Sequence, residues 1–177
     1  MNVMLYIYVD GSCLGNQNVD KDTPAGWGVV IIKDSNDLGR GNGDILHEFH
    51  GKVITSDEEE NFIGAEVGSN NTAELTAFAE ALRWCLTQGG DEDIIIKTDS
   101  QYAGNQATGN WKAKANRELV SHVQNLWNEV SELRELSWEH VKAHSGHRWN
   151  ERADHLAIRA ASDETPESLS FWKPGQR

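Results

Sequence analysis

The chain has 177 residues, 38% of them hydrophobic and 25% charged, with a formal net charge of -12. This length suits one domain with a substantial core, and two cysteines are too few for a disulfide framework, so we expect a reducing compartment, the cytoplasm. No apolar stretch approaches the length of a membrane span, no secretory signal is visible near the first residue, and the acidity argues at face value against polyanionic partners.

The first predicted element is a strand that runs from Leu5 and ends in Asp10. Alternation puts apolar or aromatic side chains on both of its faces, a pattern typical of a central strand in a covered sheet. Gly11 then allows the chain to turn. Taken alone, Asp10 is as consistent with an acid that opens a turn as with a functional group.

Two further strands are predicted over 27–33 and 45–55, joined by the turn-rich segment 34–44. Three strands separated by turns predict an antiparallel meander. The segment that follows, 56–67, contains four consecutive acids at 57–60. We interpret it as a solvated loop within a small insertion.

The strongest helical pattern covers 72–88, with Asn71 as the N-cap and Gly89 as the stop. Glu74 would then occupy the third helical position, where an Asn-x-x-Glu start favours a capping box. The same residue lies in helical register with the buried stripe, where an unpaired carboxylate is costly. Glu74 is therefore either a capping residue or part of a site.

The second half of the chain alternates strands and helices. A buried strand over 94–98 ends in Asp99, and the strand–helix–strand order predicts a right-handed crossover that places this strand parallel to the first. The remaining predictions are helices over 100–106 and 116–133, a strand over 137–142, a helix over 149–161 and a poorly ordered tail over 162–177. The result is an α/β fold, a mixed sheet flanked by helices in one domain over 1–161.

Four acids occupy positions from which they can meet at one end of this sheet. Asp10 and Asp99 end neighbouring parallel strands, where sites form in open α/β sheets. Glu74 and Asp154 each stand in register with the buried stripe of their helix. Four carboxylates at one place repel each other unless cations hold them together. Oxygen ligands without clustered thiolates favour Mg²⁺ or Mn²⁺.

Four stretches of the sequence carry a family resemblance. They are YVDGSCLGN at 8–16, NNTAEL at 70–75, TDSQY at 98–102 and VKAHSGHRWNERADHLA at 141–157. With these motifs in this order, the chain resembles the type 1 ribonuclease H family across residues 3–161. The resemblance implies a ribonuclease H-like fold with a five-stranded mixed sheet in the order 3-2-1-4-5. It also implies four metal-binding carboxylates, which are Asp10, Glu74, Asp99 and Asp154.

The same resemblance implies an endonuclease that hydrolyses the RNA strand of RNA–DNA hybrids with two metal ions and leaves 5′-phosphate and 3′-hydroxyl ends. Mg²⁺, or Mn²⁺ in its place, is the expected cofactor. The expected partner is the hybrid, bound by a monomer. His144 matches the family's histidine for proton transfer or product release, with an exposed loop histidine of no function as the alternative.

RNA differs from DNA most consistently at the 2′-hydroxyl. By resemblance, four amides contact this group and the minor groove: Asn16, Asn70, Asn71 and Gln101. Amides suit this task because they offer both donors and acceptors. A turn and an N-cap remain a second role for Asn70 and Asn71. Trp111 and Trp127 are candidates for packing against nucleic acid or helices, with a core role at least as well supported for Trp127.

Three departures from the family pattern bear on binding. The segment 56–67 is an insertion, no hybrid-binding module is expected before the first strand, and the basic protrusion of many bacterial members is reduced to Lys112, Lys114 and Arg117. Two divalent ions would change the net charge from -12 to -8. However, 102–117 contains no acid, and local charge decides docking more than the total does. We therefore expect hybrid binding of modest strength.

Two other classes of protein fit parts of this pattern. A catalytically inactive nucleic-acid-binding module of the same fold would be expected to lose one or more of the four acids, and all four are present. A DNA strand-transfer or junction-resolving enzyme shares the fold and the metal chemistry but does not need the four amides as a set. Cleavage of labelled hybrid, double-stranded RNA and double-stranded DNA separates the three classes.

Overall fold

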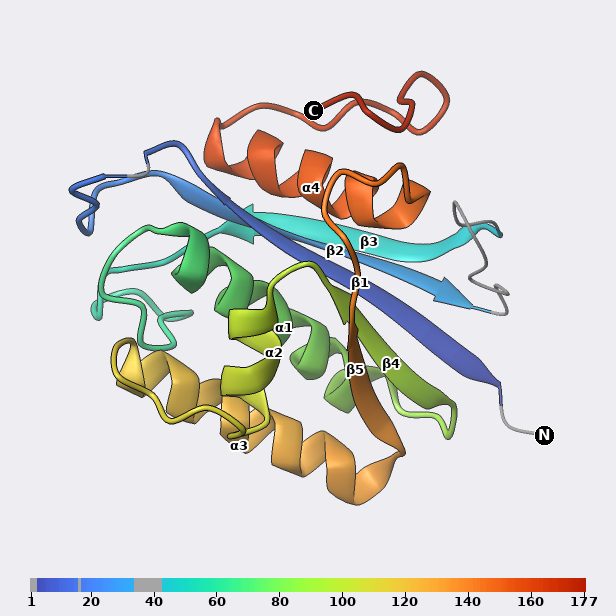
Figure 1. The fold of residues 1–177 in the computed structure, drawn as a ribbon, viewed down its shortest axis with the longest axis horizontal. Helices are drawn as coiled ribbons and strands as arrows, with labels where there is room; N and C mark the ends of the chain where they lie inside the picture. Colours follow the sequence, from blue (N-terminus) through green and yellow to red (C-terminus); the bar gives the residue numbers. More distant parts are fainter. Residues whose placement is uncertain (1–2, 16, 34–42) are drawn as a thin grey trace.

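The computed structural model describes residues 3–15, 17–33 and 43–177 of the chain. Asn16, one of the four predicted amide contacts, lies outside the described residues, as does most of the predicted turn-rich segment 34–44. Within the described ranges, no helix is both long and apolar enough to cross a membrane. Figure 1 shows a twisted sheet with helices on both of its faces.

Five strands form one mixed sheet in the predicted order, β3-β2-β1-β4-β5. The strands are β1 (Met4–Cys13), β2 (Ala25–Lys33), β3 (Ile45–Lys52), β4 (Asp93–Thr98) and β5 (Leu136–His140). β1 pairs antiparallel with β2 and parallel with β4, so the meander and the crossover meet on β1. Leu5, Ile7 and Tyr8 are at most 2% exposed, which confirms that both faces of β1 are covered.

The helices in the described ranges are α1 (Asn70–Gln88), α2 (Gln101–Ala107), α3 (Arg117–Leu133) and α4 (Arg148–Ala161). α1, α2 and α3 lie on one face of the sheet and α4 lies on the other (Figure 1). The larger core forms under α1 and α3 and includes Phe78, Leu82 and Val123. The smaller core forms under α4 and includes Tyr8 and Trp149. The sheet is therefore the middle of three layers.

α4 packs closely on β2 because two contact positions of this strand have no side chain. A Cβ atom at Gly28 would lie 2.5 Å from the carbonyl oxygen of Ala153, and one at Gly26 would lie 2.4 Å from that of Ala157. Both distances are far inside van der Waals contact, so the backbone of α4 rests directly on the strand. These two glycines set the distance between α4 and the sheet.

α1 begins two residues earlier than predicted, and its N-cap is Ser69 rather than Asn71. The Ser69 hydroxyl accepts a hydrogen bond from the Thr72 amide at 3.0 Å, and the Thr72 hydroxyl accepts one from the Ser69 amide at 2.9 Å. This reciprocal pair is a capping box made with Thr72 instead of Glu74. The Glu74 carboxylate therefore has no part in the cap.

Residues 162–177, for which a poorly ordered tail is predicted, contain no helix or strand but pack against α4 (Figure 1). The indole of Trp172 is buried, with 4% of the residue exposed. Its ring centroid lies 6.0 Å from that of His155 on α4. A large apolar side chain thus helps to hold a mostly polar segment on the helix, and composition alone does not reveal such an anchor.

Candidate active site

Three carboxylates meet where β4 ends beside β1. The parallel register places Val9 of β1 next to Thr98 of β4, so the residues that follow them, Asp10 and Asp99, are neighbours. Glu74 joins them from α1, and the three residues each offer a carboxylate oxygen within 4.8 Å of the others. The structure therefore brings together three of the four predicted acids.

Gly11 explains how α1 approaches this part of β1. A Cβ atom at Gly11 would lie 2.4 Å from the carbonyl carbon of Ala73 and 2.4 Å from the amide nitrogen of Glu74. Only a residue without a side chain permits this contact between the two backbones. The close approach puts the Glu74 side chain next to Asp10, with which it shares a hydrogen bond.

Burial and mutual repulsion raise the pKa values of the three acids. The pKa of Glu74 rises to about 8, chiefly because its carboxyl group is buried and next because of the charge of Asp99. Burial likewise holds the pKa of Asp10 well above its usual range, with Glu74 and Asp99 adding to the effect. The pKa of Asp99 is raised as well, mainly by burial. The group therefore binds positive charge, a proton or a cation, more readily than isolated carboxylates do.

The donor set fits a divalent cation. All three ligating atoms are carboxylate oxygens, which Mg²⁺ and Mn²⁺ prefer over softer ligands. Glu74 Oε2 is buried and has no hydrogen-bond partner among the described residues, an arrangement that costs free energy unless a cation or a proton satisfies it. Asp10, Glu74 and Asp99 are thus the residues that would hold a metal ion, with Asp154 close by.

Asp154 on α4 stands beside the other three acids rather than within their group. Its charge raises the pKa values of Asp10, Glu74 and Asp99, so it faces the same space. Its carboxylate is engaged by Arg177, whose Nε lies 3.0 Å from Oδ2 and whose Nη2 lies 3.2 Å from Oδ1. Sequence reasoning missed Arg177, because no motif and no periodicity mark the segment that carries it.

The loop before α4 adds His144, and the first turn of α4 adds Asn150. His144 has a positive φ of 53°, and its charge lowers the pKa of Asp99, which places the two side chains near each other. Asn150 is 2% exposed and donates a hydrogen bond to Asp99. Asn150 was not predicted. It lies one helical turn before Asp154, and this i, i+4 spacing is the signal that identifies it.

His147 caps α4 and ties this helix to β1. Its Nδ1 accepts a hydrogen bond from the backbone amide of Asn150 at 3.5 Å, and its Nε2 lies 3.3 Å from the hydroxyl of Tyr8. Tyr8 is fully buried and lies two residues before Asp10 on the same strand. The contact therefore connects the strand that carries Asp10 with the helix that carries Asp154.

The predicted amide contacts lie at the starts of two helices. Asn70 and Asn71 form the first turn of α1, and Gln101 is the first residue of α2. Asn71 and Gln101 are exposed, and both helices begin near the acids, since Glu74 lies on α1 and Asp99 lies two residues before the first residue of α2. A contact with nucleic acid therefore remains open to them, and the N-cap role considered for Asn71 is filled by Ser69.

A pocket of about 550 Å³ is shared by one of these amides, Asn71, and the short basic segment. Trp111, Lys112 and Lys114 of that segment contribute to its lining. Trp111 is 45% exposed, so its ring is accessible to a ligand. Trp127, by contrast, packs against Phe78 with 6.3 Å between ring centroids, which confirms its core role.

The sheet order and the carboxylate cluster beside β1 and β4 define an α/β protein of the ribonuclease H-like class. A comparison with protein families matches residues 2–162 to RNase H. A ribonuclease H from Pectobacterium atrosepticum is 32% identical over 97% of this chain and 98% of its own length. A ribonuclease HI from Neisseria meningitidis serogroup A is 33% identical over 92% and 98%. The chain belongs to the ribonuclease H family.

Solved structures agree with this assignment. RNase H1 from Halobacterium salinarum is 26% identical and superimposes with a TM-score of 0.64, covering 90% of this chain and 98% of that one. LC11-RNase H1 in complex with an RNA/DNA hybrid is 25% identical, with a TM-score of 0.64 and coverage of 90% and 97%. The fold that positions the acids is therefore that of the RNase H1 enzymes.

Proposed function

We propose that this ribonuclease H cuts the RNA strand of RNA–DNA hybrids internally at the centre formed by Asp10, Glu74, Asp99 and Asp154. The observation that carries the proposal is the cluster of three buried carboxylates whose oxygens lie within 4.8 Å of one another. Three buried carboxylates this close together repel one another, and a folded protein keeps such an arrangement where it binds positive charge. The RNase H1 neighbour that holds an RNA/DNA hybrid supports the choice of substrate.

Two divalent ions, Mg²⁺ or Mn²⁺, are the proposed cofactors, and when bound they supply Lewis acidity for attack by water and for departure of the 3′ oxygen. The carboxylates of this chain hold and neutralise that charge, and Asn150 fixes the orientation of Asp99 through its hydrogen bond. His144 is placed beside Asp99 to move a proton at the leaving oxygen or to assist product release. The proposed products carry 5′-phosphate and 3′-hydroxyl ends.

For recognition, we assign the RNA strand to the amides at the starts of α1 and α2. Asn70, Asn71 and Gln101, together with Asn16, are proposed to contact 2′-hydroxyl groups, which DNA lacks. The pocket with Trp111, Lys112 and Lys114 adds an aromatic face and two cations beside Asn71. Such a combination suits a phosphate backbone and its sugars.

We further propose that the protein acts as a monomer in the cytoplasm. Cys13 and Cys85 are free thiols, which suits a reducing compartment. The inactive-module alternative is disfavoured because all four acids are present and three of them form a cluster. A strand-transfer activity has no particular observation in its favour.

The test is a cleavage assay with three end-labelled duplexes of one sequence: RNA–DNA hybrid, double-stranded RNA and double-stranded DNA. We expect Mg²⁺-dependent cuts within the RNA strand of the hybrid only, and no cuts when EDTA is present. The products should serve as substrates for an exonuclease that requires a 5′-phosphate. Cleavage of double-stranded DNA, or products that resist this exonuclease, would contradict the proposed specificity or the proposed ends.

A further inference from the structure

Arg177 occupies a position in the candidate active site that no catalytic role explains. Its guanidinium forms a forked pair with Asp154, at 3.0 Å between Nε and Oδ2 and 3.2 Å between Nη2 and Oδ1. Both oxygens of the carboxylate are therefore engaged by one cationic group. The pKa of Arg177 is raised, chiefly by this hydrogen bond and also by the charge of Asp10. Arg177 thus sits within the field of the acid cluster.

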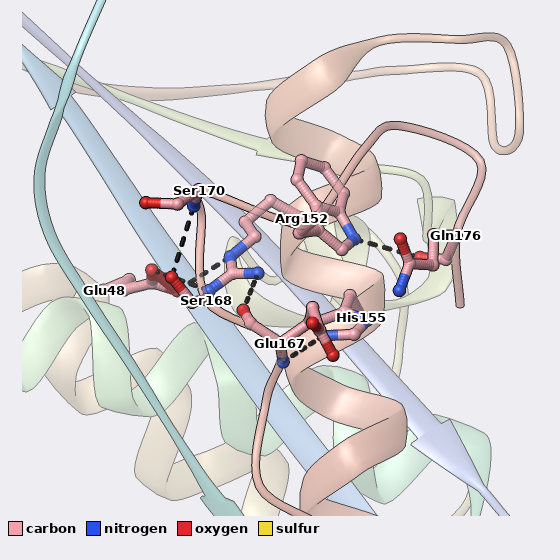
Figure 2. Close-up of polar contacts among 8 residues, drawn as sticks. Glu48, Arg152, His155, Glu167, Ser168, Ser170 and Gln176 are labelled. Atoms are coloured by element: carbon pink, nitrogen blue, oxygen red, sulfur yellow. Dashed lines mark hydrogen bonds and ion pairs between the residues drawn. The ribbon is translucent and has the colours of Figure 1, made fainter.

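The segment that carries Arg177 is anchored close to its end. Trp172 is buried against α4, where the guanidinium of Arg152 lies 5.3 Å from its ring centroid. The indole Nε1 donates a hydrogen bond to the carbonyl oxygen of Gln176 at 3.0 Å (Figure 2). This bond closes a turn directly before Arg177. The buried Trp172 therefore anchors the backbone directly before Arg177, whose own side chain is 58% exposed in its pair with Asp154.

A second set of bonds holds the earlier part of the segment. Arg152 forms a forked ion pair with Glu48 on β3, with two distances of 3.0 Å, and donates to the carbonyl oxygen of Glu167 at 2.8 Å (Figure 2). The Glu167 amide donates to Nε2 of His155 at 2.9 Å. Arg152 and His155 are 3% and 0% exposed. Two buried polar side chains of α4 thus have partners in this segment.

The turn between these anchors and Arg177 borders the active-site loop. Pro174 and Gly175 line a pocket of about 610 Å³ together with His144, Arg148 and other residues of the loop and of α4. The segment therefore lies beside the loop that carries His144, and its Arg177 contacts Asp154.

We propose that residues 162–177 form an inhibitory strap in which Arg177 and a divalent cation compete for Asp154. This inference rests on the proposed function, since it requires the carboxylates to be a cation site. A guanidinium on Asp154 neutralises the charge that would attract the ion and repels the ion itself. A cation that takes Asp154 as a ligand in addition to the three clustered acids therefore displaces Arg177 from Asp154, while Trp172 keeps the strap attached to α4.

The first test measures cation affinity without nucleic acid. Mn²⁺ or Mg²⁺ is titrated calorimetrically into the protein ending at residue 177 and into its Arg177→Ala variant. We expect the variant to bind the ion about two- to fivefold more tightly, the range that breaking a partly exposed ion pair allows. Lys173→Ala is the matched control, because it removes one positive charge from the same segment. It should bind within the error of the wild type.

The second test follows the guanidinium directly. In protein labelled with ¹⁵N-arginine, the Nε–H resonance of Arg177 is the one missing from the Arg177→Ala spectrum. We expect this resonance to shift in proportion to cation saturation, while that of Arg159, which pairs with Glu164 at 3.1 Å, stays in place. Equal affinities of wild type and Arg177→Ala, or an unmoved Arg177 resonance at saturation, would overturn the strap.

The Asp10→Asn variant separates a failure of the strap from a failure of the proposed function. If this variant binds the ion more weakly than the wild type while Arg177→Ala binds it equally, the cation site stands and the strap is wrong. If Asp10→Asn binds the ion as the wild type does, or if neither protein binds it, the assignment of the carboxylates as a cation site is wrong. The strap proposal is then wrong as well.

Discussion

Asp10 is the most deeply buried residue of the acid cluster and contacts its neighbours there. We therefore expect the proposed cation site to depend most on the charge of Asp10. We predict that Asp10→Asn lowers the cleavage rate on the order of 10²-fold or more, because the substitution keeps the shape of the side chain but removes charge from the proposed cation site. Hybrid binding should persist, since the amides and the basic segment are unchanged. Single-turnover cleavage of labelled hybrid and a binding titration measure the two effects.

The control for this prediction is Asp57→Asn, the same chemical change in an exposed loop. It should leave both measurements unchanged. A rate of Asp10→Asn within tenfold of the wild type in Mg²⁺ would contradict the assignment of the four carboxylates.

Glu74 should make the stability of the metal-free protein depend on pH. Its pKa rises from 4.5 to about 8 on folding, so between these values the folded state holds a proton that the unfolded state has lost. Stability from this group is therefore full below about pH 4.5 and is lost as pH rises toward 8. In EDTA, we expect the melting temperature of the wild type to fall by several degrees relative to that of Glu74→Gln as the pH rises through this interval.

Comparing the two proteins at each pH removes the contribution of the histidines, which is common to both. Addition of Mg²⁺ at pH 8 should raise the melting temperature of the wild type above that of Glu74→Gln, because the ion stabilises the wild type more. Parallel curves of melting temperature against pH in EDTA would show that Glu74 does not hold an extra proton in the folded protein.

At the scale of elements, a side-chain contact at the N-terminus of α4 joins this helix to β1, in addition to the core that the two elements share. The hydroxyl of Tyr8 lies 3.3 Å from Nε2 of the capping residue His147, and Tyr8 is fully buried. We predict that Tyr8→Phe lowers the free energy of unfolding by about 1 kcal/mol, the usual net value of a buried hydrogen bond. Urea unfolding measures this change, with Tyr6→Phe on the same strand as the control for the loss of a hydroxyl group. An equal loss in both variants would leave no special role for the contact.

The elements themselves could be predicted to different degrees. β1 was predictable because a strand covered on both faces is apolar along its whole length, and Tyr8, Ile7 and Leu5 show that directly. The start of α1 was not, because Ser69 and Asn71 are both good N-caps. In the structure the helix begins after Ser69, which exchanges hydrogen bonds with Thr72 in a capping box.

The residues of the candidate site also differ in how well the sequence predicts them. Asp99 follows β4, and Asp10 lies in β1 where its parallel pairing with β4 ends, three residues before the strand itself ends at Cys13. The predicted parallel crossover is therefore enough to bring the two acids together, although the predicted end of the strand at Asp10 is wrong. The pair of Asp154 and Arg177 joins residues 23 positions apart, and Arg177 belongs to a segment without periodicity. Its position depends on the burial of Trp172, which composition cannot foresee. Asn150 lies between these cases, since its i, i+4 spacing from Asp154 places it on the same face of α4, but no motif marks it as a partner of Asp99.

For the whole molecule, the net charge of -12 disfavours a polyanionic ligand, so the strength and salt dependence of hybrid binding depend on the few local cations. Few cations are available to the phosphate backbone, so we expect modest affinity and a shallow salt dependence that corresponds to roughly three to five phosphates. Replacing Lys112 and Lys114 together by Ala should weaken hybrid binding and flatten the log–log slope by up to about 2. A salt titration of affinity at constant Mg²⁺ measures both.

The matched control replaces Lys33 and Lys52, which pair with Glu92 and Asp163 away from the pocket. This double variant should keep the slope of the wild type, and the rate at saturating hybrid should change little in either protein. Identical slopes for all three proteins would show that the segment with Lys112 and Lys114 does not touch the backbone of the substrate.

The two glycines of β2 have a consequence for how variation in this protein should be interpreted. A methyl group at Gly28 would meet the carbonyl oxygen of Ala153 at 2.5 Å, so α4 would have to move, and Asp154 with it. Such a variant would keep every acid of the site and the same net charge, yet the fourth carboxylate would stand at a different place. β2 contributes no ligand to the site, but its glycines set the distance between α4 and the sheet and so determine where Asp154 lies. If relatives were classified only by whether they have the four acids, a chain with a larger residue at this position would be counted as having an intact site.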